Sequence, residues 1–281
     1  MTEEALELRA VPGPSALGGG RRRSLELLYL IAVNDFKRVY FNTLLGYVWS
    51  LARPLMLFGV LLEVFTHIFR LKGHIAHYPI FLLLDIVLFG FFQEATLTAV
   101  GSIVGHESVV RKTQFPRLVI PLSVVLTSLF NLGLNLVVVL IFTLGFGITP
   151  TWSWLLLIPV LLALFVFTTA VSMLLSALYP RYRDVLIIWS VFSTALFYAT
   201  PVLYPLSAVS STLRDVISLN PLAPLLGLVQ RWVTNPQTPW PTASSQGGPV
   251  RLAVAIGIYV AVCVLAVRVF RREAPRIAEE L

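Results

Sequence analysis

Charged residues are scarce in this sequence. Asp, Glu, Lys and Arg make up 12% of the 281 residues, about half the share of roughly 25% that is usual in soluble proteins. Apolar residues reach 57%, and the mean hydropathy is +0.83. So few polar side chains cannot cover a water-soluble globule, and the composition therefore predicts an integral membrane protein.

Cysteines and enzyme motifs are also lacking. The single cysteine, Cys263, excludes a disulfide framework and a cysteine-rich zinc or iron–sulfur site. The sequence has no G-x-x-x-x-G-K-[ST] motif, so this chain does not bind ATP through a P-loop. Zinc-protease helices and nucleophile elbows are missing too. We therefore expect no catalytic site, no metal site and no cofactor in this chain.

Acidic residues are few in the loops between the apolar segments, where only Glu107, Asp184 and Asp215 occur. A membrane enzyme that acts on diphosphate substrates needs clustered carboxylates to hold Mg²⁺. The loops contain no such cluster, which argues against a membrane-embedded glycolipid enzyme.

Six segments are long and apolar enough to cross a bilayer, which takes about 20 residues. The segments are approximately 47–69, 79–104, 118–146, 152–178, 185–205 and 250–270. The fifth contains Pro201, which is expected to bend or end its helix. The sequence thus predicts an all-α polytopic membrane protein with six spanning helices.

The distribution of Lys and Arg predicts the orientation. With six spans, sixteen of the 21 basic residues fall on the side of the two termini and five on the other side. The positive-inside rule therefore places both termini in the cytoplasm. Short basic clusters between spans are typical of membrane topology and not of a nucleic-acid interface. Residues 1–23 contain no apolar signal-peptide core and are interpreted as a disordered cytosolic tail.

Three further segments are expected to lie outside the spans. An amphipathic interface helix is predicted at 24–42; a short helix that merely leads into the first span is the alternative. Its apolar face consists of Leu25, Leu28, Ala32, Phe36 and Val39. The loop 106–117 is predicted to form a short cytosolic helix. In the external segment 205–249, apolar runs at 216–219 and 222–233 predict two short re-entrant helices, followed by an exposed loop.

Three carboxylates, Glu63, Asp85 and Glu94, fall inside predicted spans. A charge in hydrocarbon costs about 2.5 kcal/mol or more, so these groups should face protein or water. They line a polar path or relay protons in one interpretation. In the other they are neutral, paired or close to the membrane surface.

Aromatic side chains also occur within the spans. Trp189, Phe192 and Tyr198 recur at helical spacing and are candidates for one stripe facing a transport path, because sugar rings stack on aromatic faces. Phe89 and Phe92 in the second span are further candidates. Simple packing or lipid contact is the alternative for each of them.

Five sequence segments occur in an order that resembles a known family. They are FNTLLGYVWSLARPL (41–55), RKTQFPRLVIPLS (111–123), LLSALYPRYRDV (174–185), FYATPVLYP (197–205) and LNPLAPLLGLVQRWV (219–233). The chain resembles, over about residues 24–281, the transmembrane (permease) subunit of ABC-2-type polysaccharide exporters. That family moves O-antigen, capsule, wall teichoic acid or mycobacterial galactan precursors.

The resemblance implies an assembly. Residues 43–281 would form an ABC-2-type transmembrane domain, and two copies would associate as a homodimer. Two separate ABC ATPase subunits, which bind ATP and Mg²⁺, would dock beneath them. The loop 106–117 matches the family's coupling helix, and the RYRDV turn matches a short cytoplasmic turn where Asp184 would pair with Arg181 or Arg183. The residues expected to contact the ATPase are Glu107, Arg111, Lys112, Phe115, Pro116 and Arg117.

The resemblance also implies a transport reaction. A lipid-linked polysaccharide would leave the cytoplasmic side of the plasma (inner) membrane along a partly aromatic path that includes Trp189, Phe192 and Tyr198. Arg38 and Arg53 would attract its head group at the cytoplasmic entrance. Two alternatives remain. One is an ABC-2 exporter of drugs or lipids; the other is a proton-coupled secondary transporter that uses the carboxylates within the spans, although we find no internal sequence repeat.

Overall fold

The computed structural model describes residues 21–40, 46–68, 77–106, 117–204, 206, 209–234 and 248–274. Every regular element in these ranges is helical, which confirms the predicted all-α class. In chain order they are α1 (Arg21–Tyr40), α2 (Gly46–Glu63), the π-helix η1 (Val64–Ile68), α3 (Tyr78–Val100), α4 (Ser102–Gly105), α6 (Val119–Gly145), the 3₁₀-helix η2 (Trp152–Leu156), α7 (Leu157–Leu178), α8 (Val185–Ala199), α9 (Ser211–Ile217), α10 (Leu222–Thr234) and α11 (Pro249–Glu273).

Within the described residues, five helices are long and apolar enough to cross a membrane. They are Val48–His67, Tyr78–Val100, Val119–Gly145, Trp152–Leu178 and Pro249–Glu273. The predicted fifth span is shorter than expected, since α8 has only 15 residues. It ends before Pro201, whose ring removes a backbone donor and disfavours helix in the preceding residue. The chain is thus a multi-pass membrane protein.

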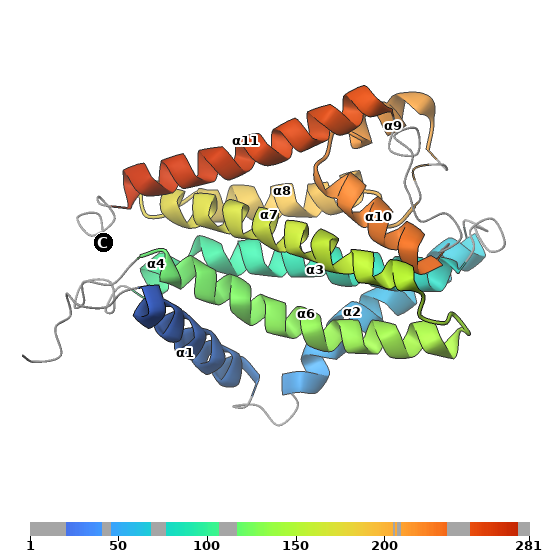
Figure 1. Cartoon of the computed structure of the whole chain (residues 1–281), viewed down its shortest axis with the longest axis horizontal. Helices are drawn as coiled ribbons and strands as arrows, with labels where there is room; N and C mark the ends of the chain where they lie inside the picture. Colours follow the sequence, from blue (N-terminus) through green and yellow to red (C-terminus); the bar gives the residue numbers. More distant parts are fainter. Residues whose placement is uncertain are drawn as a thin grey trace, which may run out of the picture.

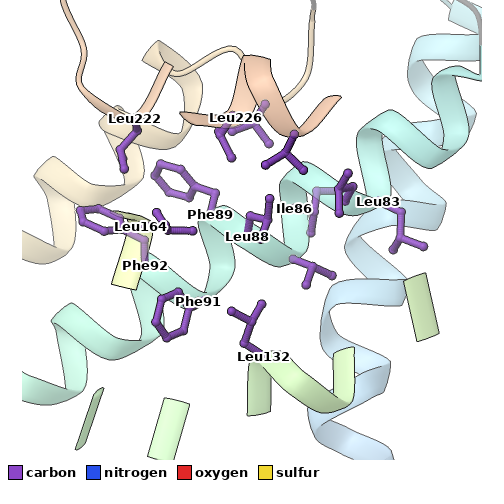
Figure 2. Close-up of a cluster of buried hydrophobic side chains, with 14 of the residues drawn as sticks. Leu83, Ile86, Leu88, Phe89, Phe91, Phe92, Leu132, Leu164, Leu222 and Leu226 are labelled. Carbon is purple, nitrogen blue, oxygen red and sulfur yellow. The ribbon is translucent and has the colours of Figure 1, made fainter. Parts of the chain in front are cut away.

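The helix α3 is the centre of the bundle and lies between α6 and α7 (Figure 1). Apolar residues occur on all of its faces, as expected for a helix that is surrounded by protein. Figure 2 shows Phe89 and Phe92 of α3 among Leu164 of α7 and Leu222 and Leu226 of α10. The core therefore joins α3 to spanning helices on one side and to the short helix α10 on the other.

Different helices lie at the two ends of the bundle. The start of α1, the helix α4 and the end of α11 lie at one end, whereas α9 and α10 lie toward the other end, where α3 begins (Figure 1). A small cluster of Ile103, Ile120, Ala177 and Phe270 packs the ends of α4, α6, α7 and α11 together.

A helix is present where the amphipathic helix is predicted. In α1, Phe36 packs edge-to-face against Phe130 of α6, with 5.7 Å between ring centroids. The buried Ala32 accepts a 3.2 Å hydrogen bond at its carbonyl from Thr127 of α6. Leu25, at the start of the same apolar face, is exposed. The apolar face is therefore only partly covered by protein.

Two short helices also follow α8, but the first differs from the prediction. The helix α9 begins at Ser211 and ends at Ile217, so the apolar run 216–219 lies at its end and beyond it. The next helix starts where predicted, because the side-chain oxygen of Asn220 accepts a 3.0 Å hydrogen bond from the amide of Leu222. An ion pair of 2.6 Å between Asp215 and Arg251 connects α9 to the start of α11.

Candidate functional site

A pocket of about 990 Å³ lies between α2, α3, α6 and α8. This volume is at the upper end of the range for small-molecule binding sites. Its polar lining residues are Ser50, Arg53, Gln93, Glu94, Thr98, Ser128, Asn131, Asn135, Ser190 and Thr194. Its aromatic lining residues are Trp49, Phe89, Phe91 and Phe197. Such a polar lining between membrane helices marks a water-filled space or a substrate path, because lipid does not solvate these groups.

A chain of hydrogen bonds connects three of the lining residues. Asn131 of α6 donates a 2.9 Å hydrogen bond from Nδ2 to Oε2 of Glu94 on α3. Asn135, one turn further along α6, donates from its own Nδ2 to the side-chain oxygen of Asn131 at 3.2 Å and to its carbonyl at 2.9 Å. Arg53 of α2 lines the same pocket. The pocket therefore contains the carboxyl group of Glu94, the guanidinium group of Arg53 and two carboxamides.

The α8 wall of the pocket presents hydroxyl groups. Ser190 and Thr194 donate their hydroxyl protons to carbonyls of their own helix, at 2.8 and 2.9 Å. Each hydroxyl oxygen keeps acceptor capacity after this donation. Gln93 of α3 reaches Ser193 of α8 at 3.4 Å. The α8 wall therefore adds acceptors to the pocket.

The structure divides the aromatic residues that the sequence singled out. Trp189 is directed toward α3, where its Nε1 donates a 3.0 Å hydrogen bond to the hydroxyl of Thr96. Phe89 and Phe92 are each 1% exposed, and Phe89 also borders the pocket. Phe192 and Tyr198 are exposed on α8 and do not line the pocket. The three residues of the predicted stripe thus do not share one environment.

The three carboxylates within the spans are held in separate places. Asp85 is fully buried and accepts a hydrogen bond from Gln230 of α10, which also donates to the carbonyl of Pro201 at 3.2 Å. Glu94 faces the pocket, and Glu63 is exposed and lies 3.1 Å from His67. In the part of the chain that the structure describes, they are not joined in a single network, as a shared proton relay would require.

The remaining predicted site residues lie in α1, in the turn before α6, or outside the described residues. Arg38 belongs to α1, and the half-buried Arg117 lies in the turn before α6. Glu107, Arg111, Lys112, Phe115 and Pro116 lie outside the described residues.

Asp184 makes no ion pair within 4.0 Å with Arg181 or Arg183 in the described residues, so this prediction is wrong. The guanidinium of Arg183 instead lies over the ring of Tyr179, 5.1 Å from its centroid, and Arg181 lies over Tyr182 at 5.4 Å. The planar guanidinium group binds an aromatic face well and leaves the exposed carboxylate to water.

A bundle of membrane helices around a polar pocket defines a membrane transport protein. The ABC-2 type transporter model matches residues 26–231, and the chain belongs to this family. An O-antigen export system permease protein RfbA from Klebsiella pneumoniae is 31% identical over 202 residues, which cover 72% of this chain and 77% of the relative. A protein of the same name from Myxococcus xanthus is also 31% identical over 202 residues, covering 71% of this chain and 77% of the relative.

Asn131 and Asn135 were not among the site residues predicted from the sequence. Both are carboxamides within an apolar run, four residues apart and therefore on one helix face. That spacing is a usable signal for a polar lining. Their pairing with Glu94 depends on the register between α3 and α6, which periodicity within one helix does not determine.

Proposed function

We propose that this chain is the membrane subunit of an ATP-driven exporter that moves a lipid-linked polysaccharide from the cytoplasmic to the outer side of the plasma membrane. The substrate is a cell-wall or surface glycan precursor carried on a polyprenyl diphosphate. The relatives named O-antigen export permeases support this proposal, as do the five sequence segments quoted above. The geometric observation that carries it is the polar pocket among α2, α3, α6 and α8.

The energy for transport comes from partner subunits in this proposal. Two copies of the chain form a homodimer, and two ABC ATPase subunits bind ATP and Mg²⁺. A second copy would cover the apolar faces of α2 and α8 that border the pocket, where Val60, Ile187 and Val191 are more than 60% exposed. The segment between α4 and α6 carries the coupling helix, with Arg111, Lys112 and Arg117 as charged contacts and Phe115 as an apolar anchor beside Pro116. ATP-driven closure acts on the membrane subunits through this segment.

The proposed topology has six spans, with α8 and the turn after it as the fifth. The excess of basic residues on one side supports cytoplasmic termini. Residues 1–23 form a cytosolic tail, 24–42 an interface helix that contains most of α1, and 43–281 the transmembrane domain. The helices α9 and α10 then lie at the outer exit as re-entrant gate helices.

The proposed substrate path begins at Arg38 and Arg53, which attract the diphosphate, and continues through the pocket. The exposed faces of Phe192 and Tyr198 on α8 are suited to stack on sugar rings further along. Trp189 contacts Phe192, with 5.5 Å between ring centroids, and supports it from the protein side.

Two experiments test the proposed function. Tagged protein is extracted gently from its native membrane, and the co-purified proteins are identified by mass spectrometry. A P-loop ATPase in a fixed ratio to this chain is the expected result. Deletion of the gene should also abolish surface polysaccharide while lipid-linked precursor accumulates inside the cell. Unchanged surface polysaccharide after deletion would contradict the proposal.

A further inference from the structure

The pocket has more hydrogen-bonding capacity than the packing of its helices requires. Asn131 occupies one carboxylate oxygen of Glu94, and within the described residues no group donates to the other oxygen. The side-chain oxygen of Asn135 likewise accepts no hydrogen bond in this part of the chain. A buried oxygen without a hydrogen-bond donor would count as a buried unsatisfied atom, and neither of these oxygens does. Both oxygens are therefore accessible. The Asn131–Glu94 bond joins α6 to α3 and leaves these two oxygens unused.

We propose that this pocket is a binding site for neutral sugar units of a glycan, recognised by hydrogen bonds to Glu94 and Asn135, which Asn131 connects and holds in place. The inference rests on the proposed function and adds the position and the charge preference of a sugar site. The hydroxyls of a sugar donate to the accessible oxygens of Glu94 and Asn135 and accept from the guanidinium of Arg53. Such a site rejects a ligand that lacks these hydroxyls, because its own polar groups then stay unpaired.

The charges of the pocket favour a neutral sugar over a carboxylated one. Arg53 lines the same pocket but makes no ion pair with Glu94 within 4.0 Å in the described residues. A sugar carboxylate that bonds to Asn131 or Asn135 would therefore lie beside the carboxyl group of Glu94, whose Oε2 is 2.9 Å from Nδ2 of Asn131, and two carboxyl groups so close together disfavour each other's charge. A neutral sugar avoids this repulsion and still donates hydrogen bonds to the oxygens of Glu94 and Asn135.

Aromatic faces complete the site. Trp49 of α2 is 60% exposed, and Phe197 of α8 is half-buried; both line the pocket. An exposed indole ring supplies a flat apolar surface for the C–H face of a sugar, while the hydroxyl edge of the same sugar points toward Glu94 and Asn135. An apolar drug or lipid tail would use only the aromatic side of the pocket.

Site-directed thiol protection tests the proposal, because Cys263 is the only cysteine and is readily replaced. Thr194, an exposed residue of the α8 wall, bonds only to its own helix and is changed to Cys in a Cys263→Ser background. The full transporter with its co-purified ATPase is labelled with 2-hydroxyethyl methanethiosulfonate. Labelling is repeated with neutral pentasaccharides of glucose, galactose and mannose, and with acidic pentagalacturonate.

We expect at least one neutral pentasaccharide to slow the labelling and pentagalacturonate not to slow it. Asn131→Leu should weaken the protection at least about tenfold, since it removes hydrogen bonds that include the one to the Glu94 carboxylate. Glu94→Gln keeps an acceptor without the charge, so it should retain protection by the neutral sugar and gain protection by pentagalacturonate. A purely structural role of Glu94 would not change this charge preference. Glu63→Gln, at an exposed carboxylate outside the pocket, is the matched control and should change nothing.

Absence of protection by every neutral pentasaccharide would overturn the sugar site, and so would equal protection by neutral and acidic sugars. Unchanged protection in both Asn131→Leu and Glu94→Gln would overturn the assigned residues. Labelling without sugar and retention of the ATPase show that each variant is folded. If the sugar site fails this test but gene deletion still abolishes surface polysaccharide, the proposed function stands. If the deletion strain keeps its surface polysaccharide, the proposed function itself is wrong.

Discussion

Gln230 of α10 donates a side-chain hydrogen bond to the carboxylate of Asp85, a fully buried residue of α3. The second carboxylate oxygen of Asp85 has no hydrogen-bond partner in the described residues. The same glutamine amide reaches the carbonyl of Pro201 in the turn after α8. One side chain therefore joins the central helix, the end of α8 and a short helix at one end of the bundle.

Replacement of Gln230 and replacement of Asp85 should affect the stability of the protein differently. Gln230→Leu leaves a buried carboxylate without its donor and should lower the free energy of unfolding by about 1–3 kcal/mol. Asp85→Asn keeps an acceptor for Gln230 and removes a carboxylate from the core, so its stability should equal or exceed that of the wild type. Thermal unfolding of the purified protein in detergent measures both. A loss of stability in Asp85→Asn as large as that in Gln230→Leu would contradict this account of the contact.

The hydrogen bond from Trp189 to Thr96 predicts a second difference in stability, between two tryptophan variants. Trp189→Phe removes the indole donor and should destabilise the protein by about 1 kcal/mol beyond the loss of ring contacts. Trp154 is the matched control, because its Nε1 is buried and has no partner in the described part of the chain. Trp154→Phe removes an unsatisfied donor and should therefore be less harmful than Trp189→Phe. Equal losses of thermal stability in the two variants would exclude a contribution from the Trp189 bond.

The long spans were predictable because apolar length follows from composition along one chain. Apolar length identifies a spanning helix, and Pro201 predicted the end of α8 correctly. The start of α9 was not predictable from the apolar run 216–219. A helix of seven residues at the surface depends on local capping and on contacts such as the Asp215–Arg251 ion pair more than on apolar periodicity.

The pocket was less predictable than the fold. Glu94 stood out as a carboxylate within a span, but its pairing with Asn131 is a contact between residues 37 positions apart. The aromatic spacing on α8 suggested one face for Trp189, Phe192 and Tyr198. In the bundle, the neighbouring α3 buries Phe92 against Trp189 and leaves Tyr198 exposed, so tertiary packing decides which ring meets a pathway.

This difference in burial makes the third prediction. Phe92 lies 5.7 Å from Phe89 and 5.9 Å from Phe167 between ring centroids, so Phe92→Ala should create a cavity and cost about 3–5 kcal/mol. Phe192 is exposed, and Phe192→Ala should leave folding nearly unchanged but reduce polysaccharide export if its ring lines the path. Expression, thermal unfolding and surface polysaccharide are measured together. Normal export by the combined Phe192→Ala and Tyr198→Ala variant would assign these rings to lipid or packing contact.

The last prediction concerns the segment between α4 and α6, which the family resemblance assigns to the ATPase. Phe115→Ala removes a proposed apolar anchor, and Arg111→Glu reverses a charge at the same surface. An aromatic or arginine anchor at an interface contributes about 2 kcal/mol or more, so the combined variant should bind the ATPase at least about 30-fold more weakly. Co-purification across a dilution series in detergent measures the change. Arg70→Glu, a charge reversal on the predicted external side, is the control and should not affect binding. The ATPase contact lies elsewhere on the chain if the double variant retains the partner as well as this control does.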